Sequence, residues 1–360
     1  MNIHPAGLEP HVIHAASPDE LLAAVPHLLG FVPENSLVVI GTGSPRGQVI
    51  VTLRFDLPDP ADAGQAADIA GYARDALASS GATGMAAVGY GPGPLVTPLA
   101  DALRAEAPEP GPRLLELLRA DSGRYWSYLC PGTCHPGEGT VPAPVRVPAP
   151  APLASRAVLA ASIAPLEGQI AAQMTAETSR CERIAARYNA IAGVTPGTPA
   201  ASHVLAKYGS RAVTAVIGGY RVGRPVPAAG TLAWLSVTLT SLRVRDLAWA
   251  YMAPGHATAH QRLWTDLTRR ARPGYIAAPA SLLAFVAWQS GNGALARLAL
   301  DRAQADDPGY SMARILRSCI QDCLPPAAAH MPELPLPSGT ADTQLPPATP
   351  SAKAGHDDRP

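Results

Sequence analysis

Residues 142–152 read PAPVRVPAPAP, and this proline-rich segment divides the chain into two parts of different character. Proline lacks a backbone N–H group and holds φ near about −65°, so such a run forms a semi-rigid spacer rather than a helix or a central strand. Before the spacer, strand-length apolar runs alternate with helical patterns; after it, the pattern is helical throughout. We therefore predict a mixed α/β domain over residues 13–140, a linker over 141–152 and a helical domain over 153–323.

The prediction of a mixed sheet with covering helices rests on the apolar periodicity, which switches between the helical and the strand period. Ser17, Pro18 and Glu20 have the spacing of a capping box, which marks the start of the first helix. The expected order is helix, strand, strand, helix, strand, helix and a final hairpin, over residues 21–31, 36–41, 48–58, 62–81, 83–91, 95–106 and 114–130. We expect the first two strands to pair with each other and the last two to turn at residues 121–123.

The helical domain contains one segment, AWQSGNGALARLALDRAQADDPGY, with the spacing of a tetratricopeptide-like hairpin. Gly291, Ala296, Ala303 and Pro308 fall on the bend, the two close helix contacts and the helix end of that repeat. The residues one period earlier do not match. We therefore predict a single repeat-like hairpin over residues 278–308, with a true repeat array as the less favoured alternative.

Composition and charge argue against several classes of partner. The chain has 28 basic and 28 acidic side chains, so its net charge is zero and it lacks the basic excess that nucleic acids and anionic membranes attract. The first residues show no signal-peptide pattern, and no apolar run reaches the roughly 20 residues of a membrane span. Five cysteines in 360 residues do not make a disulfide framework. We expect a cytoplasmic protein with a disordered proline-rich tail over residues 324–360.

The usual catalytic signatures are absent from the sequence. It contains no phosphate-binding GxxxxGKS or GxxxxGKT, no GxSxG nucleophile elbow, no HExxH zinc motif and no CxxC pair. Whether the protein is an enzyme stays open on this basis, and no cofactor is predicted.

A glycine-rich loop, GYGPGP at residues 89–94, runs from a predicted strand into a predicted helix. Glycines at such a junction bring backbone N–H groups to a ligand, and α/β folds commonly bind ligands at this end of the sheet. The candidate residues are Gly89, Tyr90, Gly91 and Gly93. Because the spacing is not GxGxxG, a plain tight turn is the favoured interpretation and a ligand loop is the alternative.

A second candidate is the pair Arg54 and Asp56 in RFDLP, which share one face of a predicted strand. Two such groups could anchor a polar ligand. The favoured interpretation is a salt bridge at the end of the strand.

The loop LCPGTCHPGEG places Cys130, Cys134 and His135 close together in the sequence. Thiolates and imidazoles bind zinc, but a structural zinc site takes four ligands and no fourth ligand is local. The hypotheses for this loop are metal binding, a reversible disulfide and, as the favoured one, a structural turn with free thiols. His256 and His260 in HATAH have the spacing of a metal pair but no acidic partner nearby, so they form a weaker candidate.

Four separated motifs, PHLLGFVPENSLVVIG, LRFDLP, RYWSYLC and AWQSGNGALARLALDRAQADDPGYSMARIL, resemble an uncharacterised bacterial family common in high-GC Gram-positive bacteria. The family is known as a domain of unknown function, and the similarity covers about residues 13–320. The resemblance implies no activity. His135 follows Cys134 where relatives tend to carry a second cysteine, so the resemblance does not support shared thiol chemistry in that loop.

Two functional hypotheses remain. The favoured one is a non-catalytic binding or regulatory protein that contacts another protein through its helical domain, because every strong catalytic signature is absent. The alternative is an enzyme that acts on a small molecule or nucleotide at the strand-to-helix loops of the α/β domain.

Overall fold

The computed structural model describes residues 16–43, 47–106, 111–130, 137–147, 151–195, 198–252, 254–322, 324 and 326. The chain divides into two compact units. Unit 1 comprises Met1–Ser162, Ala287–Arg297 and Ile315–His330, and unit 2 comprises Ile163–Val286, Leu298–Arg314 and Met331–Pro360.

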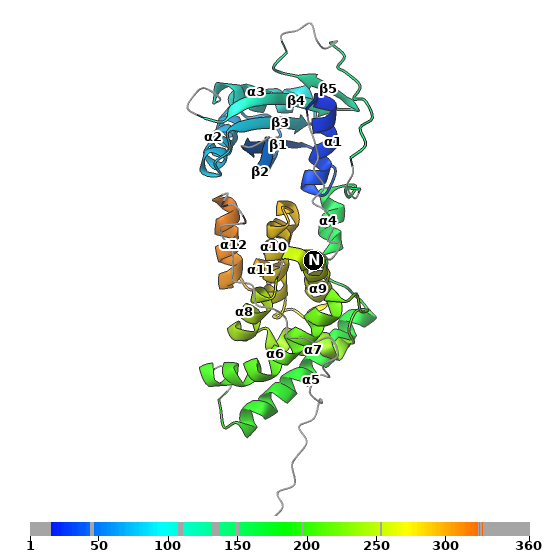
Figure 1. Cartoon of the computed structure of the whole chain (residues 1–360), viewed down its shortest axis with the longest axis vertical. Helices are drawn as coiled ribbons and strands as arrows, with labels where there is room; N and C mark the ends of the chain where they lie inside the picture. The colour runs from blue at the N-terminus through cyan, green and yellow to red at the C-terminus, as the bar shows by residue number, and fades with distance from the viewer. Residues whose placement is uncertain are drawn as a thin grey trace, which may run out of the picture. The chain divides into compact units, whose positions relative to one another are not determined.

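Unit 1 is built on a mixed five-stranded sheet with the strand order β2-β1-β3-β4-β5 (Figure 1). Strand β1 runs antiparallel to β2 and β3, β3 runs parallel to β4, and β4 runs antiparallel to β5. The elements are α1 (Pro18–Leu29), β1 (Ser36–Gly43), β2 (Gln48–Asp56), α2 (Ala63–Ser79), β3 (Gly84–Tyr90), α3 (Gly93–Ala105), β4 (Arg113–Asp121), β5 (Arg124–Ser127) and α4 (Arg156–Ser162). The predicted order of helices and strands, both predicted hairpins and the mixed α/β class are confirmed.

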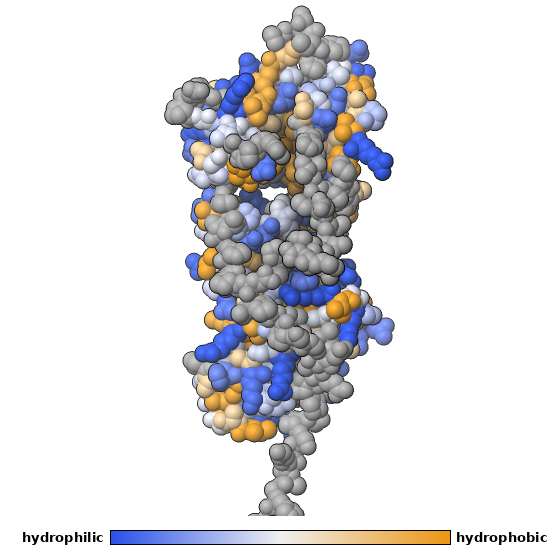
Figure 2. All heavy atoms as spheres, in the orientation of Figure 1, coloured by the Kyte–Doolittle hydropathy of each residue, from blue (hydrophilic) through white to orange (hydrophobic). Residues whose placement is uncertain are grey.

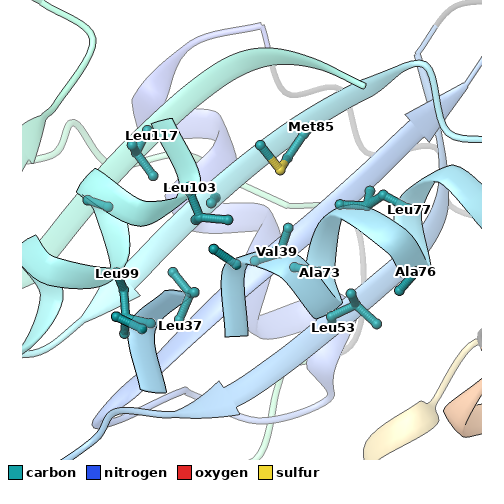
Figure 3. Close-up of a cluster of buried hydrophobic side chains, with 14 of the residues drawn as sticks. Leu37, Val39, Leu53, Ala73, Ala76, Leu77, Met85, Leu99, Leu103 and Leu117 are labelled. Atoms are coloured by element: carbon teal, nitrogen blue, oxygen red, sulfur yellow. The ribbon is translucent and has the colours of Figure 1, made fainter. Parts of the chain in front are cut away.

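Helices α2 and α3 cover one face of this sheet, and a hydrophobic core lies between the helices and the strands (Figure 3). Leu77 of α2 and Leu99 of α3 are buried there with Leu37 and Val39 of β1 and Leu117 of β4. Side chains alternate along a strand, so Leu37 and Val39 share this face whereas the residue between them points to the other face. The core under α2 and α3 therefore takes one residue in two along β1.

The opposite face of the sheet is buried as well. Val38 of β1 lies directly across from Val88 of β3, which in turn pairs with Leu118 of β4, and all three side chains are fully buried. A strand buried on both faces needs a continuous apolar run, which explains the sequence LVVI after Ser36 in β1.

Helix α1 begins and ends with the predicted signals. The backbone N–H of Glu20 donates to Ser17 Oγ at 3.3 Å, and the Glu20 carboxylate accepts from the backbone N–H of Ala16 at 2.7 Å. Gly30 follows the helix in the left-handed conformation, with φ of 78°, and turns the chain toward β1.

The segment around the predicted linker belongs to unit 1, and its backbone hydrogen-bonds to α1 and to the residue that follows α1. The N–H of Ala143 donates to the Asp19 carboxylate at 3.1 Å, and the N–H of Leu153 donates to the carbonyl of Gly30 at 2.9 Å. The linker over residues 141–152 and the domain boundaries based on it remain predictions.

Unit 2 is helical. Its helices include α5 (Gln169–Ile191), α6 (Pro199–Arg221), α7 (Ala229–Thr238), α8 (Leu242–Ala250) and α9 (Ala257–Arg270), with the short 3-10 helix η1 (Pro254–His256) before α9. Helix α5 contacts α6 and α7, and α6 contacts α8 and α9. Trp264 of α9 is fully buried, and Tyr188 of α5 stacks on Tyr208 of α6 with ring centroids 4.0 Å apart. The predicted all-helical character of this part of the chain is confirmed.

The last helices are α10 (Ala277–Gln289), α11 (Gly293–Asp306) and α12 (Ser311–Gln321). The predicted helical hairpin is present, and Gly291 lies in its turn with φ of 77°. Asn292 caps α11, because its side-chain oxygen accepts from the N–H of Leu295 at 3.0 Å. Ala296 and Ala303 are fully buried on α11. The finer likeness to a tetratricopeptide repeat remains a prediction.

No helix in the described ranges is long and apolar enough to cross a membrane. On the side of the molecule drawn in Figure 2, hydrophobic and hydrophilic residues are interspersed.

Candidate functional site

Two cavities border the sheet of unit 1, and together they contain four of the residues that the sequence suggested for ligand binding. The first, here called the arginine cavity, has a volume of about 420 Å³ and is lined by Arg54 and Asp56 among others. The second, the strand-end cavity, has a volume of about 470 Å³ and is lined by Tyr90 and Gly91 among others. Both volumes lie in the range of small-molecule sites. All lining residues of both cavities belong to unit 1.

Arg54 on β2 is the least exposed charged group of the arginine cavity. Its side chain is 17% exposed, and its Nη2 donates a hydrogen bond to the Asp56 carboxylate at 2.8 Å. The salt bridge favoured for this pair is therefore present. The Asp56 side chain is 83% exposed, so water screens it strongly. The Arg54 Nε is buried and has no hydrogen-bond partner among the described residues, which leaves a donor of this guanidinium unused.

Two further arginines line the arginine cavity from distant parts of the chain. Arg156 is the first residue of α4, and Arg297 lies near the start of α11. Both are exposed, and neither has a side-chain partner in the part of the chain that the structure describes. The lining thus holds three guanidinium groups and one carboxylate, an excess of two positive charges.

The other walls of the arginine cavity are mostly apolar. They include Leu28, Leu29, Phe31, Val49, Ile50, Val51, Leu53, Trp288, Ala294, Ile320 and Leu324. The turn between α10 and α11 adds bare backbone, because a Cβ placed on Gly291 or Gly293 would meet no other atom within 4 Å. The N-terminal end of α11, where the helix dipole places partial positive charge, is part of this wall through Gly293 and Ala294.

The strand-end cavity lies at the carboxyl ends of the parallel strands β3 and β4, where α/β sheets commonly bind ligands. Its polar lining consists of Glu34, Asn35, Tyr90, Asp121, Ser122 and Arg124. The Tyr90 hydroxyl is buried without a hydrogen-bond partner in the described chain, and burial raises the pKa of Tyr90 well above its usual value. This hydroxyl therefore stays protonated and can both donate and accept.

The glycines of the GYGPGP loop are explained by close packing. A Cβ on Gly89 would lie 2.3 Å from Val96 Cγ1, so glycine at this position lets α3 approach the sheet. A Cβ on Gly93 would lie 2.1 Å from Arg119 Nη1. Gly91 has φ of 146°, and its N–H donates to the carbonyl of Ala120 at 2.9 Å. Gly89 and Gly93 line neither cavity, and these contacts agree with the favoured interpretation of a tight turn.

The cysteine loop is only partly described. Cys130 is disulfide-bonded, which corresponds to the disulfide hypothesis rather than to the favoured free thiol. Cys134 and His135 lie outside the described residues. Within the described residues, no three His, Cys, Asp or Glu side chains are grouped as a metal site requires.

The two histidines of HATAH differ in environment. His256 is exposed at the start of α9, whereas His260 is 1% exposed. Burial, and then the charges of Arg221 and His256, lower the pKa of His260 to about 3. The guanidinium of Arg221 lies 3.4 Å from His260 Nε2. A neighbouring cation disfavours a second cation, so this geometry argues against a metal ion at His260.

Sequence reasoning missed Arg156 and Arg297 in the arginine cavity and Glu34 and Asp121 in the strand-end cavity. Glu34 and Asp121 adjoin ends of predicted strands. Knowledge of the order of strands in the sheet would have placed them near Tyr90. No sequence pattern marks Arg156 or Arg297, because their neighbouring residues do not distinguish them from other exposed arginines on helices.

A mixed α/β unit with two ligand-sized cavities, followed by a helical unit, defines the class of this protein. Residues 18–327 match the model of a family described as a domain of unknown function, DUF4192. The chain belongs to this family, which confirms the resemblance to an uncharacterised family. No curated protein and no solved structure matches the chain.

Proposed function

We propose that this protein binds a small anionic molecule with an apolar body in the arginine cavity, and that it acts as a binding or regulatory protein rather than as an enzyme. The observation that carries the proposal is the placement of three guanidinium groups against apolar walls in one cavity. Guanidinium groups match the geometry of carboxylates and phosphates, and apolar walls hold the rest of a ligand.

Arg54, the least exposed of the three arginines, is the central group in this proposal. Its one ion-pair partner, Asp56, points toward water, and its Nε has no partner in the described chain. At present Arg54 contacts the Asp56 carboxylate, which water screens. A ligand carboxylate or phosphate that reached Arg54 would accept charge-assisted hydrogen bonds from it in a less hydrated place, where such bonds are stronger. Arg156 and Arg297 at the rim would attract the anion and balance a second negative charge.

The lining supports binding more than catalysis. Arginine stays protonated in proteins and does not exchange protons at neutral pH. The one carboxylate, Asp56, is held by Arg54 and exposed to solvent. The described lining of the arginine cavity contains no histidine, cysteine or lysine, and its hydroxyl side chains are Thr52 and Ser80. Its one carboxylate is paired with Arg54, so the lining offers charge complementarity without an unpaired general base to activate a hydroxyl. The protein partner predicted for the helical domain remains a separate proposal, which a pull-down from native cells would test.

A thermal-shift and calorimetric titration with matched ligand pairs tests the proposed function. Medium-chain and aromatic carboxylates and phosphate monoesters should bind, and the neutral alcohols of the same size should bind at least about tenfold more weakly, since one charge-assisted hydrogen bond contributes about 1.5–3 kcal/mol. Arg54→Gln should reduce the affinity for the anions by about tenfold or more.

Arg113→Gln is the matched control, because Arg113 is an exposed arginine of unit 1 that lines neither cavity. Anion affinity that is equal in the Arg54→Gln variant and in the wild type would overturn the proposal, as would tighter binding of the neutral alcohols.

A further inference from the structure

The strand-end cavity carries a second inference, which uses none of the residues of the arginine cavity. Three structural features meet there: the carboxyl ends of β3 and β4, an unpaired buried hydroxyl on Tyr90, and two carboxylates without a cationic partner. The GYGPGP motif pointed to Tyr90, but no motif in the sequence pointed to the two carboxylates beside it.

Ser36 and Tyr90 place two hydroxyl groups at the same end of the sheet. Tyr90 of β3 pairs with Ser36 of β1 in the antiparallel ladder, so their side chains project from the same face of the sheet. Ser36 is fully buried, and its Oγ, like the Tyr90 hydroxyl, has no hydrogen-bond partner among the described residues. Buried polar groups in proteins are almost always paired, so each of these two unpaired hydroxyls needs an explanation. A polar ligand in the strand-end cavity, which Tyr90 lines and Ser36 does not, supplies one for the Tyr90 hydroxyl.

The charged side chains of the strand-end cavity give it a net negative charge. Glu34 precedes β1 and is exposed, and no ion pair or side-chain hydrogen bond joins it to another described residue. Asp121 ends β4, and the only side-chain contact found for it in the described ranges is a hydrogen bond from Ser122 Oγ at 3.0 Å. Arg124 is the single basic residue of the lining, and its Nη1 donates to the carbonyl of Gly139 at 3.0 Å. Two carboxylates against one guanidinium leave one net negative charge.

The backbone holds these groups in a fixed arrangement. Ser122 and Gly123 both have positive φ, 50° and 75°, which is the geometry of a two-residue hairpin turn between β4 and β5. Asn35 also has positive φ, 42°, and its carbonyl accepts from the N–H of Leu57 at 3.0 Å. Asp121 and Glu34 are thus each next to a conformationally restricted residue, so the fold sets the backbone positions from which both side chains start.

We propose that the strand-end cavity is a second binding site, specific for a small molecule that carries an ammonium group and a hydrogen-bonding oxygen or nitrogen. The ammonium donates to the carboxylates of Glu34 and Asp121, and the second polar group pairs with the Tyr90 hydroxyl. Arg124 keeps the net charge of the cavity low enough to accept a single positive charge. The site is opposite in charge to the arginine cavity, so the two cavities select different ligands.

Titration of the full chain with a set of small amines, amino alcohols and amino acids tests this proposal, and the corresponding neutral alcohols and amides serve as controls. Saturable binding of amines in preference to their neutral counterparts is expected by calorimetry and by NMR. Asp121→Asn should weaken amine binding by about tenfold, because it removes a charge-assisted contact. Tyr90→Phe should weaken binding of amino alcohols more than binding of simple alkylamines, because only the former have a partner for the hydroxyl.

Asp101→Asn is the matched control, since Asp101 is an exposed carboxylate of unit 1 on α3 and lines neither cavity. Its amine affinity should equal that of the wild type, and the denaturation midpoint of each variant shows whether it is folded. The proposal is overturned if no amine in the set binds in preference to its neutral counterpart, or if Asp121→Asn and Asp101→Asn bind amines equally. Arg54→Gln should leave amine binding unchanged, which separates this result from the test of the arginine cavity.

Discussion

The arginine cavity and the strand-end cavity belong to the same unit, yet they differ in charge, in wall chemistry and in origin along the chain. The arginine cavity is positive and mostly apolar, and its lining extends from Leu28 to Pro326. The strand-end cavity is polar with one net negative charge, and its lining extends only from Leu22 to Pro142. A cavity at strand ends follows from local topology, whereas a cavity assembled from distant segments depends on how those segments pack.

The largest expected effect is a charge reversal in the arginine cavity. Arg54→Glu places two carboxylates, at positions 54 and 56, beside an anionic ligand. We expect anion affinity to fall by about a hundredfold or more, since truncating a buried charge pair costs about 2–5 kcal/mol. Calorimetric titration measures this loss, and Arg113→Glu is the control. Amine binding in the strand-end cavity should be unchanged. A loss of amine affinity together with anion affinity would show that the two cavities are not independent.

A smaller effect is expected from overpacking α11, which supplies one wall of the arginine cavity. Ala296 is fully buried, so Ala296→Leu should lower the free energy of unfolding by about 1–3 kcal/mol and should weaken anion binding. Ala305→Leu, an exposed position on the same helix, should change stability by less than about 0.5 kcal/mol. Chemical denaturation compares the two variants. Equal midpoints for Ala296→Leu and the wild type would mean that position 296 is not at a close helix contact.

The rim of the arginine cavity should matter for binding and not for stability. Arg297 is exposed, so Arg297→Gln should reduce anion affinity several-fold to about tenfold, and should change the free energy of unfolding by less than about 0.5 kcal/mol. The reduction should shrink at high salt, because exposed charges are screened. A salt-independent reduction would contradict an electrostatic role for Arg297.

The smallest expected effect on stability comes from the strand-end cavity. Tyr90→Phe removes a hydroxyl that has no partner in the described chain, so the free energy of unfolding should stay within about 0.5 kcal/mol of the wild-type value or rise slightly. A loss of more than about 1 kcal/mol on urea denaturation would show that the hydroxyl is hydrogen-bonded in the ligand-free protein. In that case the Tyr90 hydroxyl would already have a partner within the chain and would not need a ligand.

Much of the local structure could be predicted from the sequence. The capping box at Ser17, the strands of unit 1, the turn at Ser122 and Gly123 and the helical hairpin around Gly291 all follow from short-range rules of periodicity, capping and turn chemistry. The Arg54–Asp56 salt bridge was also predictable, because two residues separated by one position share a strand face.

The binding sites were harder to predict from the sequence. The glycines of the GYGPGP loop suggested a ligand, but their contacts with Val96 and Arg119 show that close packing accounts for two of them. Tyr90, the last residue of β3 and the second residue of this motif, became a candidate because its hydroxyl is buried without a partner among the described residues. A residue type indicates what chemistry is possible, and the surroundings decide whether a group is already satisfied within the chain.

The sequence by itself determined the helices and strands, the mixed α/β class of the first part and membership of an uncharacterised family, because these depend on local periodicity and on shared motifs. The tertiary structure alone decided that Arg156 and Arg297 join Arg54 in one cavity, and that Glu34 and Asp121 join Tyr90 in another. The physical reason is that charge complementarity acts over a few ångströms in space, whereas these residues are separated by tens to hundreds of positions along the chain.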